Sequence, residues 1–135
     1  MTPAVTTPRT TATVVRAGDT RQTETPNASM TTLASPSLGQ TTALALWRVS
    51  YPAGATGPLH VMDSEQVWAL ESGSASCIVD GARHDLAAGD TLRIAGGSER
   101  QFTTRDGARF VVCGHAKAVA RTEANPDGVV PPWIA

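Results

Sequence analysis

The sequence predicts an all-β protein, folded as a sandwich or a barrel, and two observations favour this fold class. Short apolar runs recur roughly every 8–12 residues between clusters of Gly, Pro, Asp and Asn, as in chains of short antiparallel strands. Apolar side chains nowhere keep the period of about 3.6 residues that an amphipathic helix requires. A chain of 135 residues is the size of one domain, so the strands are expected to share one core.

The first 29 residues differ in composition from the rest, because they are rich in Thr and Pro and poor in large apolar side chains. We expect residues 1–29 to form an extended arm, with one strand over Thr11–Arg16 and a polar, turn-like stretch over Ala17–Asn27. A rolled sheet leaves unpaired edges that need cover. The arm is therefore predicted to pair with a second copy of the chain, which makes the protein a homodimer.

Residues 30–117 hold the strands of the predicted barrel, and turn residues separate them. The strands are expected, in chain order, at Met30–Ala34, Thr42–Tyr51, Leu59–Met62, Glu65–Glu71, Ala75–Val79, His84–Leu86, Thr91–Ile94, Arg100–Thr104 and Ala108–Gly114. Asp80-Gly81 and Asp106-Gly107 are strong hairpin signals, and Ser72-Gly73-Ser74 is predicted to turn the chain between two strands. Residues 118–135 form a tail without a clear element, which is expected to pack on the barrel through Trp133.

The charge balance excludes several classes of partner. Eleven Lys and Arg face twelve Asp and Glu, for a net charge of −1, and no basic block is present. We therefore expect neither a nucleic acid nor a membrane as a partner. The chain starts without the basic segment, apolar stretch and small-residue cleavage site of a secretion signal, so a cytoplasmic protein is predicted.

Two stretches of the body have the spacing of a known pair of motifs. The first motif reads Gly57-Pro58-Leu59-His60-Val61-Met62, then Gln66, then Gly73. The second motif reads Gly81, Ala88-Gly89-Asp90, Ile94-Ala95-Gly96-Gly97 and Arg100-Gln101-Phe102. With these motifs, residues 42–115 resemble a small single-domain member of the cupin superfamily. The resemblance implies a double-stranded β-helix, also called a jelly-roll barrel, and a role in metabolite or natural-product pathways.

The chain departs from the family at the metal ligands. In metal-binding cupins, two His and a Glu of the first motif and a His of the second motif hold the ion. Here His60 is the one conventional ligand that remains. Met62 occupies the position of the second His, Gln66 that of the Glu and Arg100 that of the last His. An amide is a poor ligand for a divalent ion, a thioether suits Cu(I), and a guanidinium stays protonated. These substitutions therefore predict a barrel without a metal cofactor. An alternative remains, in which a β-bulge turns Glu65 inward and a divalent metal is held by His60, Glu65 and Gln66.

The substituted residues predict a small-molecule site. His60 titrates near neutral pH and suits general acid–base work, and Arg100 offers a forked donor that anchors an anionic oxygen. Strand alternation favours Met62, Gln66, Trp68 and Leu70 on the inner face. The residues predicted to contact the substrate are Met62, Gln66, Trp68, Cys77, Phe102, Trp47 and Tyr51.

The function that this set predicts is a small-molecule tailoring enzyme of the isomerase, cyclase, dehydratase or lyase type. Its substrate would be an apolar metabolite with a carbonyl or carboxylate group. His60 would transfer the proton and Arg100 would stabilise the oxyanion. Two alternatives remain open at this point. One is a metal-dependent cupin, a dioxygenase or a metal-assisted isomerase, using His60 and Glu65; the other is a ligand-binding cupin without catalysis.

Overall fold

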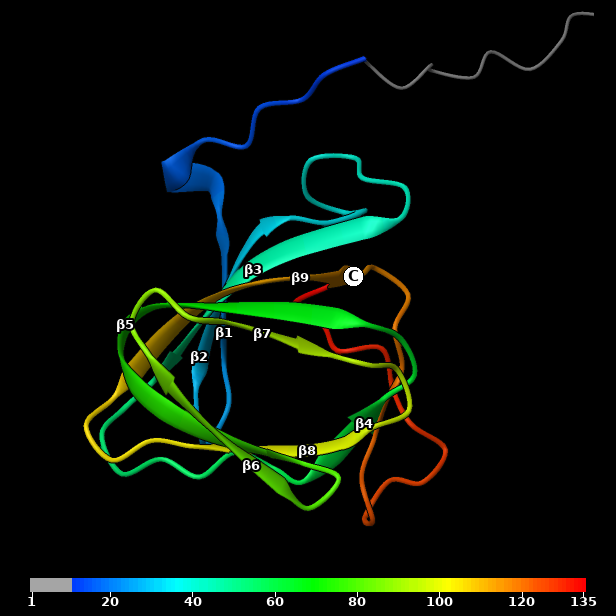
Figure 1. Ribbon diagram of the computed structural model, residues 1–135. Helices are drawn as coiled ribbons and strands as arrows, with labels where there is room; N and C mark the ends of the chain where they lie inside the picture. The colour runs from blue at the N-terminus through cyan, green and yellow to red at the C-terminus, as the bar shows by residue number, and fades with distance from the viewer. Residues whose placement is uncertain (1–10) are drawn as a thin grey trace, which may run out of the picture.

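Antiparallel strands roll into a barrel, drawn in Figure 1 with its interior facing the viewer. The computed structural model describes residues 11–135. One short 3-10 helix, η1 (Ala17–Asp19), precedes the strands. The strands are β1 (Arg21–Glu24), β2 (Ser29–Ala34), β3 (Leu44–Tyr51), β4 (His60–Met62), β5 (Gln66–Val79), β6 (Ala82–Ala87), β7 (Thr91–Ile94), β8 (Glu99–Thr103), β9 (Ala108–His115) and β10 (Ala120–Arg121).

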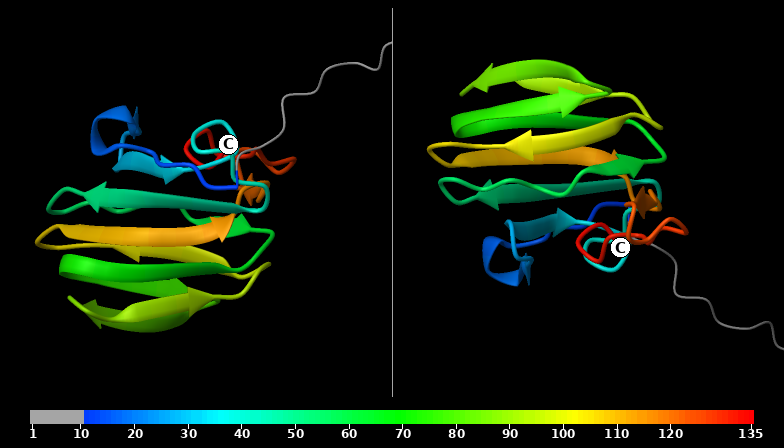
Figure 2. Two further views of the ribbon diagram at one scale, coloured as in Figure 1. Left: turned by 90° about the horizontal axis from the view of Figure 1, so that it is seen from above. Right: turned by 90° about the horizontal axis from the view of Figure 1, so that it is seen from below.

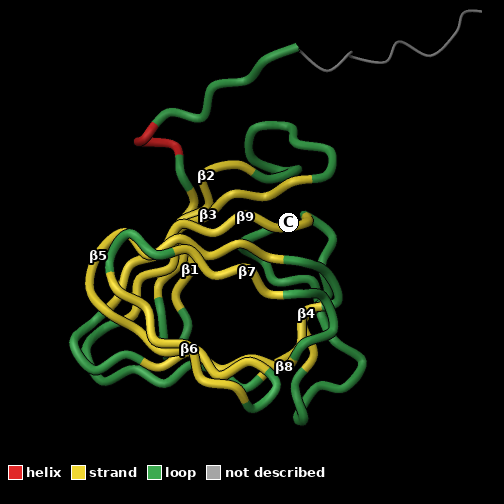
Figure 3. The backbone as a smooth tube through the Cα atoms, viewed as in Figure 1, coloured by secondary structure: helices red, strands yellow, loops and turns green. Residues whose placement is uncertain are grey.

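The strand order explains how the sheet closes around an interior. The order is β1-β2-β3-β9-β5-β8-β4-β10, and β6 and β7 both pair with β5. The first half of β5 pairs with β9 and β7, and its second half pairs with β8 and β6. One strand therefore belongs to both walls of the barrel, as the tube in Figure 3 shows. The all-β prediction is confirmed.

The predicted turn at Ser72-Gly73-Ser74 is wrong, because β5 runs through it as one strand of 14 residues. Its inward positions are even-numbered up to Leu70 and odd-numbered from Ala75, and its register with β9 shifts between Leu70 and Ser72. This bulge bends the strand from one wall to the other. Gly73 has a φ of 80°, and a Cβ at this position would overlap the carbonyl oxygen of Gly107. Ser72-Gly73-Ser74 therefore lies at a bend within one strand and does not form a turn between two strands.

The N-terminal arm is also placed differently from the prediction. Thr11–Arg16 forms no strand, and the stretch predicted as turn-like contains η1 and β1. β1 pairs with β2 of the same chain, from Arg21 opposite Thr32 to Glu24 opposite Ser29. Residues 1–10 of the predicted arm lie outside the described residues. Pairing of the arm with a second copy stays a prediction, and within one chain β1 forms the end of the sheet.

The tail lies against the barrel at the same end as β1 and β2, as both views of Figure 2 show. It contains a strand that the sequence did not indicate, β10, which pairs with β4. Thr32 on β2 donates a hydrogen bond of 2.6 Å to the backbone carbonyl of Trp133, and Ile134 is fully buried. β2 and the tail therefore meet at this end of the barrel.

Aromatic rings fill the middle of the barrel. Phe102 stacks on Trp68 with ring centroids 4.2 Å apart, and Phe110 meets both rings edge-on. Tyr51 extends the cluster by contacting Phe102 and Phe110. Such contacts add to the free energy gained by burying the rings themselves. Within residues 11–135, no helix is long and apolar enough to cross a membrane.

Candidate functional site

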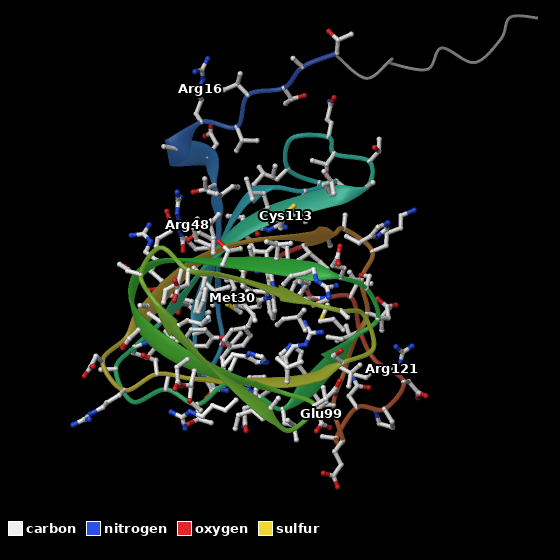
Figure 4. All side chains as sticks on the ribbon, viewed as in Figure 1. Arg16, Met30, Arg48, Glu99, Cys113 and Arg121 are labelled. Atoms are coloured by element: carbon white, nitrogen blue, oxygen red, sulfur yellow. The ribbon has the colours of Figure 1, made fainter. Side chains whose placement is uncertain are left out.

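A cavity of about 380 Å³ lies between the aromatic cluster and the chain ends. This volume is in the range of small-molecule sites. The strands supply one part of its lining, which consists of Met30, Trp47, Val49, Tyr51, His60, Met62, Gln66 and Trp68. The loops before β2 and before β4 and the tail supply the rest, which consists of Thr25–Ala28, Pro58, Ala120, Thr122, Val129 and Pro131–Trp133. In Figure 4, Met30 lies inside the barrel, whereas Glu99 and Arg121 lie on its outside.

The lining is mainly apolar, and among the described residues it contains no Asp, Glu, Lys or Arg side chain. His60 and Tyr51 are its titratable groups. Burial raises the pKa of the Tyr51 phenol well above its usual value, so this hydroxyl stays protonated. A neutral ligand therefore suits this cavity better than a carboxylate does, because an unpaired anion loses its hydration on entry.

His60 presents a base to the cavity. Its Nδ1 lies 2.9 Å from the carbonyl oxygen of Pro58, which only accepts hydrogen bonds, so Nδ1 bears the proton and Nε2 bears a lone pair. Burial lowers the pKa of His60, and the charge of Arg100 lowers it further, against the opposing effect of the Pro58 carbonyl. The imidazole is therefore neutral at neutral pH, and its Nε2 is ready to accept a proton.

Gln66 is held in one orientation. Its Oε1 accepts hydrogen bonds from Trp68 Nε1 at 3.1 Å and from Arg100 at 3.2 Å. A flipped amide would place its N–H groups against both donors, so this orientation is the one that satisfies them. The amide nitrogen has no acceptor within the described chain, although the side chain is 3% exposed and lines the cavity. Gln66 therefore offers donors, and not acceptors, to a ligand.

Arg100 lies behind Gln66 and is fully buried. Its guanidinium donates to the carbonyl oxygens of Ser98 and Ala95, at 3.2–3.4 Å, and to Gln66. None of these partners is a carboxylate. Burial lowers the pKa of Arg100, against the smaller effects of Cys77 and Asp80, yet a guanidinium stays charged in a protein. The site therefore contains a buried cation without a contacting anion.

The structure brings most of the predicted site together. His60, Met62, Gln66, Trp68, Trp47 and Tyr51 line the cavity. Alternation along β4 and β5 buries Met62, Gln66, Trp68 and Leu70, as predicted. Trp47 is 2% exposed, and its indole N–H has no hydrogen-bond partner within residues 11–135. That donor is buried and unpaired, which costs free energy.

Three predicted site residues do not line the cavity. Arg100 reaches the turn carbonyls of Ala95 and Ser98 instead, so the prediction that it anchors an anionic oxygen directly is not supported. Phe102 lies behind Trp68 in the aromatic cluster. Cys77 is fully buried opposite Phe102 on the paired strands, and burial raises its thiol pKa to about 11. Both residues support the wall without facing a ligand.

The alternative metal site is not assembled. Glu65 lies on the outer face of the barrel, with 59% of its side chain exposed, and forms a 2.9 Å ion pair with Arg93. The bulge of β5 lies beyond Leu70, too far along the strand to turn Glu65 inward. His60 faces Arg100 across the β4–β8 pair, so a cation at His60 would meet a like charge. Within residues 11–135, no three His, Cys, Asp or Glu side chains form a metal-binding group, and the side chains around His60 do not fit a divalent ion.

Residues from both chain ends complete the lining, and the sequence analysis missed them. The loop Thr25–Ala28 belongs to the predicted arm, and the sequence predicts packing of Trp133 on the barrel without a role in the ligand site. One signal points to them: an aromatic residue after Pro131-Pro132 in a polar tail needs a surface to bury it. Which surface covers it depends on pairing between distant segments, which local sequence does not show.

No protein-family model matches the chain, and no curated protein matches it in sequence. Solved structures do match in shape. DMSP lyase DddQ from Ruegeria pomeroyi has a TM-score of 0.69 and 17% identity, over 95% of this chain and 84% of that chain. Polyketide cyclase RemF from Streptomyces resistomycificus has a TM-score of 0.68 and 17% identity, over 83% of this chain and 87% of that chain. An RmlC-like cupin from Shewanella frigidimarina has a TM-score of 0.65 and 18% identity, over 76% of this chain and 88% of that chain. Likeness at such identities shows the fold, and the chain therefore has the cupin fold that its two motifs predicted.

Proposed function

We propose that this protein is an enzyme that moves a proton on a small, neutral, mainly apolar carbonyl compound held inside the barrel. The observation behind the proposal is a neutral His60 that lines an apolar cavity and whose Nε2 has no hydrogen bond among residues 11–135. A base in such a place removes a proton from the carbon beside a carbonyl group. The electron pair of that C–H bond forms a C=C bond, and the carbonyl oxygen becomes an enolate oxygen.

Return of the proton determines which reaction follows. If His60 returns it to another carbon, the product is an isomer. If the enolate expels a group or attacks a second carbonyl, the product is that of a lyase, a dehydratase or a cyclase. Two solved structures with this fold are named as a polyketide cyclase and a DMSP lyase, so proteins of this shape include both kinds of enzyme. The shared first step is the part that the cavity supports.

The test uses 2-acetylnaphthalene, a neutral aromatic ketone with exchangeable methyl protons beside its carbonyl. The protein is incubated with this ketone in D₂O, and NMR follows replacement of the methyl protons by deuterium. We expect His60→Ala to slow the exchange by about a hundredfold or more, since general bases contribute on that order. His84→Ala is the matched control, because His84 is exposed on β6, and it should exchange at the wild-type rate.

Binding and chemistry are measured separately. Quenching of tryptophan fluorescence reports binding, since Trp47, Trp68 and Trp133 line the cavity. Binding without His60-dependent exchange would contradict the enzyme and support the ligand-binding alternative. No binding of 2-acetylnaphthalene would contradict an apolar carbonyl site altogether.

A further inference from the structure

We propose that Gln66 is the hydrogen-bond donor that binds the carbonyl oxygen of the ligand, and that Arg100 is a positioning residue that acts on the ligand through Gln66. This inference deepens the function proposed above and rests on it. It identifies the group that stabilises the enolate oxygen, which the His60 chemistry requires. It also gives Arg100 a role that does not need contact with the ligand.

The first argument is the direction of the amide. Trp68 and Arg100 both donate to Oε1, which fixes the N–H₂ end on the other side of the Gln66 side chain. Both hydrogen bonds of the Gln66 side chain within residues 11–135 are made by its oxygen, and the side chain lines the cavity. An amide nitrogen without a partner in the protein can donate to a ligand or to a water. A carbonyl oxygen in the cavity would accept this hydrogen bond.

The second argument is the buried charge. The guanidinium of Arg100 has neutral partners only, and one of them is the oxygen of the Gln66 amide. A cation at the oxygen end of an amide draws electron density from its nitrogen, so the N–H groups become stronger donors. The field of Arg100 thus reaches a developing enolate, although the guanidinium itself does not line the cavity.

The third argument is the position of Arg100 between the two reacting groups. It lies directly opposite His60 in the β4–β8 pair, and it donates to Gln66 at the start of β5. One side chain therefore adjoins both the base and the donor. The unpaired donor Trp47 Nε1 has no hydrogen bond within residues 11–135 that ties it to this pair.

Gln66 packs against Gly114 of the adjacent strand β9. A Cβ on Gly114 of β9 would lie 3.1 Å from Gln66 Cγ and 3.6 Å from its amide nitrogen. A residue other than glycine would therefore press on the amide and on the ring of Trp47, which lies 3.3 Å from the same point. The glycine leaves the Gln66 side chain room to hold the orientation that Arg100 and Trp68 impose.

The experiment measures the ¹³C signal of 2-acetylnaphthalene labelled at its carbonyl carbon. A hydrogen bond to the carbonyl oxygen moves this signal downfield, so the bound ketone should show a downfield shift in the wild type. Gln66→Glu keeps an oxygen acceptor for Trp68 and Arg100 but removes the N–H donor. We expect this variant, kept free of metal by a chelator, to fold, to lose the downfield shift and to bind the ketone roughly tenfold more weakly.

Arg100→Met tests the positioning role. The ketone should still bind, since Arg100 does not line the cavity, but its downfield shift should decrease because the amide is no longer polarised or held. The pKa of His60, read from its ¹H–¹⁵N signals, should rise because a neighbouring positive charge is lost. If Arg100→Met does not fold, Arg100→Lys is used, which keeps the charge and loses the forked geometry; it should keep the lowered pKa of His60 and lose most of the downfield shift. Arg93→Met, on the outer face, is the matched control.

The outcomes separate this inference from the function on which it rests. If the wild type binds the ketone without a downfield shift, or if the shift survives in Gln66→Glu, Gln66 is not the donor, while His60-dependent exchange still supports the proposed function. If Arg100→Met or Arg100→Lys leaves the shift unchanged, Arg100 is a structural residue alone. If the ketone does not bind at all, both proposals are overturned.

Discussion

The wall of the cavity and its cover are built in different ways. The wall consists of β3, β4 and β5, which are joined to neighbouring strands by backbone ladders and packed against the ring cluster of Trp68, Phe102 and Phe110. The cover consists of Thr25–Ala28 and the tail. Backbone pairing of β10 with β4 holds the start of the tail. Hydrogen bonds from single side chains hold its end, among them Thr32 to Trp133, Arg21 to Pro132 and both Ser35 and Ser37 to Ala135.

The difference separates two tasks. The wall contains His60 and Gln66, whose chemistry needs fixed geometry, and a continuous ladder supplies it. The cover contains no titratable side chain among its described lining residues and contributes apolar surface and shape. Segments held by a few side-chain hydrogen bonds open at lower free energy than core strands do. We therefore expect changes in the wall to affect stability and chemistry, and changes in the cover to affect ligand binding.

Phe102→Ala should have the largest effect on stability. The ring is 2% exposed and contacts Trp68, Tyr51 and Phe110. Its removal leaves a cavity in the wall, which costs about 3–5 kcal/mol in the free energy of unfolding. Urea denaturation measures the change. A loss below about 1 kcal/mol would mean that the cluster does not stabilise the wall.

Trp133→Ala should weaken ligand binding more than stability. The ring lines the cavity and is half-buried, so its loss removes apolar contact with a bound ketone, and Kd should rise roughly tenfold. Its backbone carbonyl still accepts the hydrogen bond from Thr32. Val130→Ala is the control, because Val130 lies in the same tail outside the lining. Equal Kd values for the two variants would contradict a covering role for Trp133.

His60 should make stability depend on pH in a defined window. Its pKa is lowered in the folded state from 6.5. Above pH 6.5 the imidazole is neutral in both states, so His60 has no effect there. As the pH falls from 6.5 towards the lowered pKa, the unfolded chain binds the proton first, and stability decreases by at most about 1.4 kcal/mol per pH unit. Below the lowered pKa the loss stays constant.

The measurement for His60 compares urea denaturation of the wild type and His60→Gln across this range. The free energy of unfolding of the variant should not show the decrease that His60 causes in the wild type below pH 6.5. The exchange rate of the bound ketone should depend on the protonation of His60 in the same way. It should rise with pH until His60 is neutral. An exchange midpoint above 6.5 would contradict the buried, neutral base.

Arg21→Ala should have the smallest effect. Arg21 donates to the carbonyl oxygens of Pro132 and Ala135 and to Ser37, so its removal loosens the end of the tail. We expect a loss of about 1 kcal/mol in the free energy of unfolding. The dissociation rate of the ketone should rise more than the association rate does. Stopped-flow fluorescence measures both rates, with Arg105→Ala, outside the cover, as the control. Unchanged rates would show that Arg21 does not secure the cover.

Much of the wall could be predicted from the sequence. The strands Thr91–Ile94 and Met30–Ala34, the Asp80-Gly81 hairpin and the inward positions of Met62, Gln66 and Trp68 follow from alternation and turn chemistry. These signals are local, so a few residues suffice to show them. The turn predicted at Gly73 is wrong for the same reason: a positive φ occurs in turns and beside bulges alike, and pairing with β9 decides between them.

The sequence by itself determined the fold class, the cupin motifs and the residues that replace the metal ligands, because these depend on spacing along the chain. Only the tertiary structure decided that Glu65 points outward, that Arg100 stands behind Gln66 and that Thr25–Ala28 and Trp133 cover the cavity. Each of these placements depends on contacts between segments far apart in the chain. A side chain as long as that of Arg100 can reach several partners from one backbone position. Which partners lie within its reach depends on how the distant segments pack in the folded chain.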